Sequence, residues 1–271
     1  MVDSLIWKGT EMSNKFEVVT LDGRKFVKVP PNASRMVRGM SRLSYEFEQA
    51  IADLVDNSIA ANATRVDITI EQRIGGKVYV HVADNGVGID EENLPGAIQY
   101  GAADREDDSS LGVYGFGLKT ACQSFTSSFN VISITKNASA PSMITFDEEI
   151  INKYNDFLFE PQEAPAKYSR DLLKVAQGGT GTLIVTENAD RIITSENAKD
   201  EKRMQSYLFA ANKGKVFRTK QHLRKTFQRF LDHDDSRVPN VQIFINDEEV
   251  TPWDPFCAKE GNFLEAEWIS P

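Results

Sequence analysis

The clearest hydrophobic pattern in the chain is a stripe of apolar residues that recurs every three or four positions after Ser44. This period is that of an amphipathic α-helix with one buried face. Ser44 is a preferred N-cap residue, so we predict a helix of roughly 17 residues that begins there. The stripe consists of Phe47, Ile51, Leu54, Val55 and Ile59.

Shorter apolar runs, bounded by turn-forming residues, predict strands. Two lie near the N-terminus around a turn at Asp22-Gly23, and two follow the helix and are joined at Gly75-Gly76. A composition shift near Asp190 predicts a domain boundary. The predicted strands are residues 16–19, 25–29, 65–71, 77–83, 129–135, 142–146, 182–186 and 241–245. The predicted helices are residues 90–99, 118–125 and 198–231, and residues 161–165 and 247–271 are predicted to be irregular.

The composition is typical of a globular protein that does not cross a membrane. Hydrophobic residues make up 41% of the chain and charged residues 26%. No apolar run approaches the ~20 residues that cross a bilayer, and the N-terminus lacks a secretory-signal pattern. Cys122 and Cys257 are far apart, and neither they nor the three histidines show metal-ligand spacing. We therefore expect a cytoplasmic protein without a disulfide framework or a zinc site.

The charge is unevenly distributed along the chain. The net charge of −9 argues against non-specific adhesion to nucleic acid. Residues 213–229, however, contain seven basic residues and no acidic one. This basic stretch is either a solvated helix face or a surface for the phosphates of a nucleic acid or for an acidic partner. Its members are Lys213, Lys215, Arg218, Lys220, Arg224, Lys225 and Arg229.

Asp53 and Asn57 lie one turn apart on the predicted helix, so their side chains are neighbours. They flank the apolar stripe and can reach the rim of a pocket above a sheet. A carboxylate can orient and deprotonate a water molecule. An amide carbonyl can ligate Mg²⁺, which keeps waters and substrate phosphates as its other ligands. The same pair is also common on the exposed face of a structural helix.

Asp84 ends an apolar strand and begins the segment Asp84-Asn85-Gly86-Val87-Gly88. The Asn-Gly pair alone indicates a turn. A carboxylate at the end of a buried strand is nevertheless costly without a partner. The amino group of a purine is a fitting partner, and the glycines would let a flat ring approach the backbone.

Residues 112–119 form a glycine-rich segment that leads into a predicted helix. The segment is not a Walker loop, because Leu118 separates Gly117 from Lys119. It is not a dinucleotide fingerprint, because Thr120 occupies the place of the third glycine. Glycines before a helix still offer free N–H groups and the positive end of the helix dipole to phosphates, and Lys119 adds a positive charge.

These three motifs, followed by Gly181-Thr182, resemble the four sequence boxes of the GHKL (Bergerat-fold) ATPase superfamily over about residues 41–190. The chain looks most similar to the MORC-like, heat-shock-chaperone-like and MutL-like branches, because residues 115–119 match the MORC lid signature. The resemblance implies an α+β fold, a two-layer α/β sandwich of a mixed sheet with helices on one face. Nucleotide would lie between the helices and a lid at residues 100–117. Residues 1–40 would be an N-terminal segment that can dimerise, and residues 191–271 a partial transducer-like α/β domain.

The resemblance also implies a role for each motif residue. Asn57 would ligate Mg²⁺, and Asp84 would accept the adenine amino group, with Thr182 sharing a water there. Asp53 would be the general base, and Lys119 would touch a terminal phosphate. The other implied ATP-binding residues are Ala61, Gly86, Gly88, Gly112, Val113, Tyr114, Gly115, Phe116, Gly117 and Leu118, of which Gly86 and Gly88 would lie under the base.

The function implied by the resemblance is Mg²⁺-dependent ATP binding and slow hydrolysis that drive lid closure and dimerisation. Asp53 stands where the superfamily usually has glutamate, and Ala60 replaces a frequent acidic residue. Relatives also take a second cation from the transducer domain, for which only Lys213 and Lys215 are candidates. One alternative is therefore an ATP-gated binding module with negligible turnover. A histidine-kinase catalytic domain is a further alternative, disfavoured because no histidine precedes His81.

Overall fold

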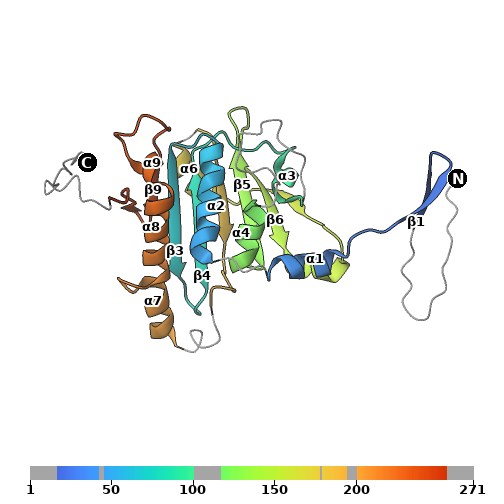
Figure 1. Cartoon of the computed structure of the whole chain (residues 1–271), viewed down its shortest axis with the longest axis horizontal. Coiled ribbons are helices and arrows are strands. Elements are labelled where there is room, and N and C mark those ends of the chain that lie inside the picture. The colour runs from blue at the N-terminus through green and yellow to red at the C-terminus, as the bar shows by residue number, and fades with distance from the viewer. Residues whose placement is uncertain (1–16, 43–45, 101–116, 178, 194–199, 255–271) are drawn as a thin grey trace, which may run out of the picture.

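The computed structural model describes residues 17–42, 46–100, 117–177, 179–193 and 200–254 (Figure 1). Its centre is an eight-stranded mixed sheet with the strand order β10-β9-β3-β4-β8-β5-β6-β7, which confirms the predicted α+β class. Neighbouring strands are antiparallel except β3 and β9, which run parallel. The strands are β3 (Arg65–Gln72), β4 (Val78–Asp84), β5 (Ser128–Ile134), β6 (Ser142–Asp147), β7 (Glu160–Glu163), β8 (Gly181–Thr186), β9 (Gln242–Ile245) and β10 (Glu248–Glu249).

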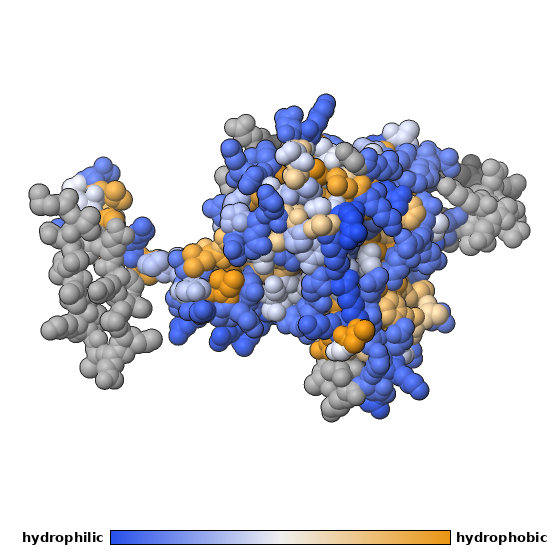
Figure 2. Space-filling model, turned by 180° about the vertical axis from the view of Figure 1, so that it is seen from behind, coloured by the Kyte–Doolittle hydropathy of each residue, from blue (hydrophilic) through white to orange (hydrophobic). Residues whose placement is uncertain are grey.

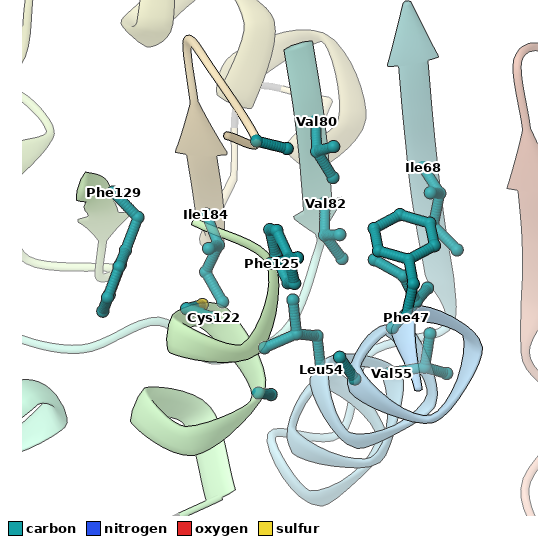
Figure 3. Close-up of a cluster of buried hydrophobic side chains, with 14 of the residues drawn as sticks. Phe47, Leu54, Val55, Ile68, Val80, Val82, Cys122, Phe125, Phe129 and Ile184 are labelled. Carbon is teal, nitrogen blue, oxygen red and sulfur yellow. The ribbon is translucent and has the colours of Figure 1, made fainter. Parts of the chain in front are cut away.

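Three helices cover the front face of the sheet: α2 (Phe47–Ala60), α4 (Gly117–Phe125) and α8 (Lys215–Thr226) (Figure 1). The apolar stripe of α2 points into the sheet as its period predicts. Figure 3 shows side chains of α2 and α4 meeting those of β3, β4, β5 and β8, and Phe47 and Phe125 meet edge to face with ring centroids 5.4 Å apart. This front-face core positions the end of α2 over the ends of β4 and β8.

Helix α2 begins later than the sequence predicts. Glu46 is the N-cap, and its backbone N–H donates to Gln49 Oε1 at 3.2 Å, which completes a capping box. The helix therefore has 14 residues, and Ser44 is not its cap. Ser44 itself lies outside the described residues.

The back face of the sheet carries helix α6 (Ala166–Ala176), which corrects the prediction of helices on one face only. Leu172 and Val175 of α6 pack against Tyr79, Leu183 and Val185 of the central strands. Strands β4 and β8 are buried along their whole length, and both of their sequences are mostly apolar at consecutive positions. Such a run is typical of a strand covered on both sides, so the signal for this helix was present.

Other elements refine the predicted pattern. Residues 160–163 form edge strand β7 rather than a loop, where Pro161 is tolerated because an edge strand has one unbonded side. The predicted long helix over residues 198–231 is three helices, broken before Gly214, where a Cβ would lie 2.6 Å from Ala210 N. Those three are α7 (Glu201–Phe209), α8 and α9 (Gln228–Leu231), and the other helices are α1 (Ala33–Met40), α3 (Leu94–Ile98) and α5 (Glu148–Tyr154).

Residues 200–250 join the same sheet and core as the rest of the fold. Strand β9 pairs with β3, with Val66 opposite Ile243, and α8 packs against α2. Leu223 and Phe227 are buried in the core that contains Val55. The expected boundary near residue 190 therefore does not separate a second, transducer-like core among the described residues.

The N-terminal hairpin of β1 (Glu17–Leu21) and β2 (Arg24–Lys28) stands away from the sheet (Figure 1). It exposes the apolar side chains of Leu21, Phe26, Val27 and Val29, of which Val29 is 69% exposed. The view from behind shows hydrophobic atoms on this projection (Figure 2). An isolated two-stranded hairpin is marginally stable in water, so its apolar side chains need a partner surface.

Across the described residues, no helix combines the length and apolar character that a membrane span requires.

Candidate functional site

Three polar side chains form a row across adjacent strands at one end of the front face. Asp84 of β4 lies opposite Thr182 of β8, and Thr182 lies opposite Ser133 of β5. Side chains alternate along a strand, so all three share the face of Val82 and Ile184, which belong to the front core. This polar row of Asp84, Thr182 and Ser133 is buried, although the face around it is apolar. Buried polar groups are normally hydrogen-bonded, so the partners of this row define the candidate site.

Asp84 is held by three donors. Its Oδ1 accepts hydrogen bonds from Gly86 N at 2.9 Å and Thr182 N at 3.2 Å. Its Oδ2 accepts one from Ser58 Oγ, on the last turn of α2, at 2.9 Å. Burial raises the pKa of Asp84 above its usual value, whereas the three hydrogen bonds favour the ionised form. Oδ2, which among the described residues accepts only the hydrogen bond from Ser58, retains acceptor capacity for a ligand that donates.

Ser133 ties the row to the loop that follows β4. Its Oγ accepts from Ile89 N at 2.8 Å and donates to Gly181 O at 2.9 Å. The same Oγ lies 3.0 Å from Thr182 Oγ1. Ser58 and Ser133 were absent from the predicted site, because a single serine in a helix or strand carries no sequence signal without its cross-strand neighbours.

The glycines of this loop are required by close backbone contacts within the protein. A Cβ at Gly86 would lie 2.8 Å from Ala61 O, and one at Gly181 would lie 2.1 Å from Asp84 O. Gly88 has φ +75°, and a Cβ there would lie 2.1 Å from Ile134 O. Packing of the loop against α2 and β5 thus explains Gly86 and Gly88 without a ligand. Their predicted place under a base remains a prediction.

Gly88→Ala is expected to destabilise the fold by about 2–4 kcal/mol, because it adds a backbone clash to an unfavourable positive φ. Gly75→Ala is the matched control, since Gly75 has φ +82° in open space and should cost only about 1–2 kcal/mol. Urea unfolding of both variants measures the difference. Equal losses would show that the contact with Ile134 relaxes freely.

The predicted pair lies on helix α2, whose Ser58 contacts the row. Asp53 is half-buried, and Asn57 is exposed and adjacent to Ser58, which reaches Asp84. Asp56, which sequence reasoning did not select, is a second carboxyl one turn from Asp53. Burial, and then the charge of Asp53, raise the pKa of Asp56 from 3.8 to about 6. The native state therefore holds this proton more tightly than the unfolded chain, and stability falls as the pH rises from about 4 to about 6.

Lys119 lies in the first turn of α4, which begins at Gly117 as predicted. Its side chain is buried, and its Nζ donates to Gln99 O at 2.6 Å and to Ala97 O at 3.3 Å. Burial lowers the pKa of Lys119 to about 8, so its positive charge is lost above that pH. Contact with a phosphate would require Nζ to leave these carbonyls. Residues 112–116 of the same motif lie outside the described residues.

The basic stretch at residues 213–229 is largely occupied by contacts within the protein. Lys220 pairs with Glu248 at 2.9 Å, and Arg224 donates to the carbonyl oxygens of Thr251 and Pro252. Lys225 lies over the ring of Trp253. These contacts fasten residues 248–253 to α8. The charge of Lys220 is paired with a carboxylate, whereas the carbonyl oxygens and the ring leave the charges of Arg224 and Lys225 unneutralised.

Lys215 does not serve as a second phosphate-binding cation in this structure. It is 6% exposed, and its Nζ lies 3.3 Å from Glu48 Oε2, with Arg218 on the other oxygen of Glu48 at 3.2 Å. Glu48 belongs to the first turn of α2, whereas Asn57 belongs to its last. The ion pair fastens α8 to the end of α2 remote from the polar row.

Two grooves lie away from the polar row. One, of about 650 Å³, is on the back face between β3 and α6 and includes Tyr79, His81 and Lys167 in its lining. The other, of about 720 Å³, is beside the β3–β4 turn at Gly75 and Gly76. Neither includes Asp84, Asn57 or Lys119, so the candidate site rests on the polar row and its hydrogen bonds.

Residues 45–180, half of the chain, match the family model of the histidine kinase-, DNA gyrase B- and HSP90-like ATPases. The chain belongs to this ATPase family. The predicted membership of the GHKL superfamily is thereby confirmed, and the matched segment contains α2, the strand end at Asp84 and the start of α4.

Individual proteins are similar to part of the chain. The chain is 38% identical to ATPase MORC2B of Mus musculus and 36% identical to ATPase MORC2 of Homo sapiens, each over 108 residues. It is 33% identical over 95 residues to the DNA mismatch repair protein MutL of Aquifex aeolicus. These matches cover 34–37% of this chain. They span 10% of each MORC protein and 22% of MutL.

Proposed function

We propose that the chain binds ATP with Mg²⁺ and hydrolyses it slowly, as a nucleotide-dependent conformational switch. The observation that carries this proposal is the buried polar row at the end of an apolar sheet face. Asp84, at one end of the row, receives three hydrogen bonds and still presents an acceptor at Oδ2. Family membership supports the same conclusion.

The chemistry of the row fits an adenine base. A buried carboxylate selects a ligand that donates, and the exocyclic amino group of adenine donates where guanine has a carbonyl oxygen. Thr182 would share in binding the amino group through water.

The phosphates would lie toward the first turn of α4, which contains Lys119, because the start of a helix favours phosphate oxygens. The described residues contain no cluster of three or more His, Cys, Asp or Glu side chains that could hold a metal ion by itself. Mg²⁺ fits this arrangement as an ion carried by nucleotide phosphates, with Asn57 as its protein ligand. The ion would supply charge neutralisation at the phosphates.

Hydrolysis would use Asp53 to orient and deprotonate the attacking water. Because Lys215 is paired with Glu48, Lys119 would be the main stabilising cation, and the exposed Lys213 is the remaining candidate for a second one. This shortage of cations favours slow turnover. It also keeps the second candidate function open, an ATP-gated binding module with negligible hydrolysis.

A switch also needs a moving part and a partner. We propose residues 100–117 as the lid, most of which lie outside the described residues. We propose a second copy of the chain as the partner, through the exposed apolar side chains of the N-terminal hairpin. A histidine-kinase role is disfavoured further, because His81 is buried behind the sheet and burial lowers its pKa to about 4.

Asp84→Asn is expected to weaken ATP binding at least about tenfold, since a charge-assisted hydrogen bond in a buried site contributes about 1.5–3 kcal/mol. Asparagine keeps an acceptor for Gly86 N and Thr182 N, so the fold should persist. Asp67→Asn on the back face, where Asp67 pairs with Arg65, is the matched control. Calorimetry with ATP and GTP measures the effect, and equal affinity of the unmodified chain for both nucleotides would refute the proposal.

A further inference from the structure

We infer that Ser133 is a positioning residue that accepts a hydrogen bond from the Thr182 hydroxyl. The Thr182 oxygen can then only accept hydrogen bonds from a bound base. This inference rests on the proposed ATP site and deepens it. It assigns part of the preference for a 6-amino purine over a 6-oxo purine to a serine that would not touch the nucleotide.

The proton count around Ser133 leads to this inference. Its hydroxyl has three neighbours, Ile89 N, Gly181 O and Thr182 Oγ1, at 2.8, 2.9 and 3.0 Å. Ile89 N can only donate, and Gly181 O can only accept. Ser133 has one proton, and giving it to Gly181 O leaves its remaining lone pair for Thr182. All three hydrogen bonds form together only if Thr182 donates to Ser133.

This hydrogen bond determines which groups the polar row offers to a bound base. With its proton committed to Ser133, Thr182 Oγ1 offers only lone pairs. Asp84, one strand away, is also an acceptor. Two acceptors side by side favour an exocyclic amino group, directly or through a shared water, and disfavour the 6-oxo group of inosine or guanine.

Burial strengthens the preference for this direction of the hydrogen bond between Thr182 and Ser133. Ser133 is 2% exposed and Thr182 8% exposed, so little bulk water competes for their hydroxyls. In a buried site a hydroxyl without a partner is costly, and the complete set of bonds is therefore strongly preferred. If Ser133 is removed, the Thr182 hydroxyl becomes free to rotate and to donate to a carbonyl oxygen.

The test compares affinities for ATP and ITP, which differ at the position that carries the amino or oxo group. Ser133→Ala is expected to lower the ratio of ATP to ITP affinity about fivefold, the order of one hydrogen bond. A purely structural role, through the lost acceptor for Ile89 N, would weaken both nucleotides equally and leave the ratio unchanged. Thr145→Ala removes a hydroxyl that donates to Asn130 Oδ1 and is the matched control.

Thr182→Val provides a second route, because it keeps the bonds of Ser133 to Ile89 and Gly181. It should lower the ratio by a similar factor, and the double variant should lower it no further than Thr182→Val alone. An unchanged ratio in Thr182→Val, or in a folded Ser133→Ala, would overturn the inference. An unchanged ratio does not contradict the proposed function, provided that the unmodified chain binds ATP and Asp84→Asn weakens that binding. No ATP binding by the unmodified chain would reject both.

Discussion

Replacing Asp53 by alanine is expected to eliminate phosphate release while leaving ATP affinity within about twofold of the unmodified chain. Asp53 is half-buried on α2, one turn from Asn57. A water between its carboxylate and the terminal phosphate would lose its base, whereas Asp84 and the apolar face would be untouched. A base that acts only in the transition state contributes to turnover and not to ATP binding, so its loss lowers turnover and leaves binding unchanged. Steady-state phosphate release beside an ATP titration measures both quantities.

Asp56→Ala is the matched control for this experiment. It removes a carboxyl from the same helix, one turn away, whose pKa is raised to about 6. Turnover should persist in Asp56→Ala if Asp53 is the base. Hydrolysis that survives Asp53→Ala and disappears in Asp56→Ala would show that Asp56, and not Asp53, is the general base. Undetectable hydrolysis by the unmodified chain, with ATP bound, would favour the binding-module alternative.

Asn57→Ala is expected to abolish the part of ATP affinity that depends on Mg²⁺ and to leave the fold intact. Asn57 is exposed on the last turn of α2, so its truncation removes no core contact. An amide oxygen that joins the ion to the protein is lost, and Mg²⁺ would then be held only by phosphates and water. ATP affinity measured with Mg²⁺ and with a chelator gives the effect, and circular dichroism monitors the fold.

Asn152→Ala is the control here, because Asn152 is an exposed asparagine on the surface helix α5. Its affinities should match those of the unmodified chain in both conditions. An equal gain from Mg²⁺ in Asn57→Ala and in the control would mean that Asn57 is only a surface residue. The metal would then need another ligand.

The sequence predicts the front half of the fold well, because local periodicity and long-range packing agree there. The stripe of α2 and the strands around Gly75-Gly76 are confirmed nearly residue for residue. Helix α6 was missed although the apolar runs of β4 and β8 indicated a covered back face, because that pattern does not say which segment of the chain covers it. The parallel pairing of β9 with β3 joins positions about 177 residues apart, and no local pattern encodes such a contact.

In the candidate site, too, some residues could be predicted from the sequence and others could not. Asp84 could be selected because a carboxylate at the end of an apolar strand conflicts with its surroundings. Ser58 and Ser133 could not, since their importance comes from distances across elements. The basic stretch, for which the sequence left two interpretations open, shows the converse case. Its charge is evident in the sequence, but the carboxylates and carbonyls that occupy Lys215, Lys220 and Arg224 are contributed by residues 27 or more positions away.

The most direct test of the central claim is a crystal structure of the chain with a non-hydrolysable ATP analogue and Mg²⁺. The adenine amino group is expected within hydrogen-bonding distance of Asp84 or of a water that Asp84 shares with Thr182, with the phosphates toward the first turn of α4. A nucleotide bound elsewhere, for example in the groove between β3 and α6, would contradict the claim. So would a base whose amino group points away from the polar row.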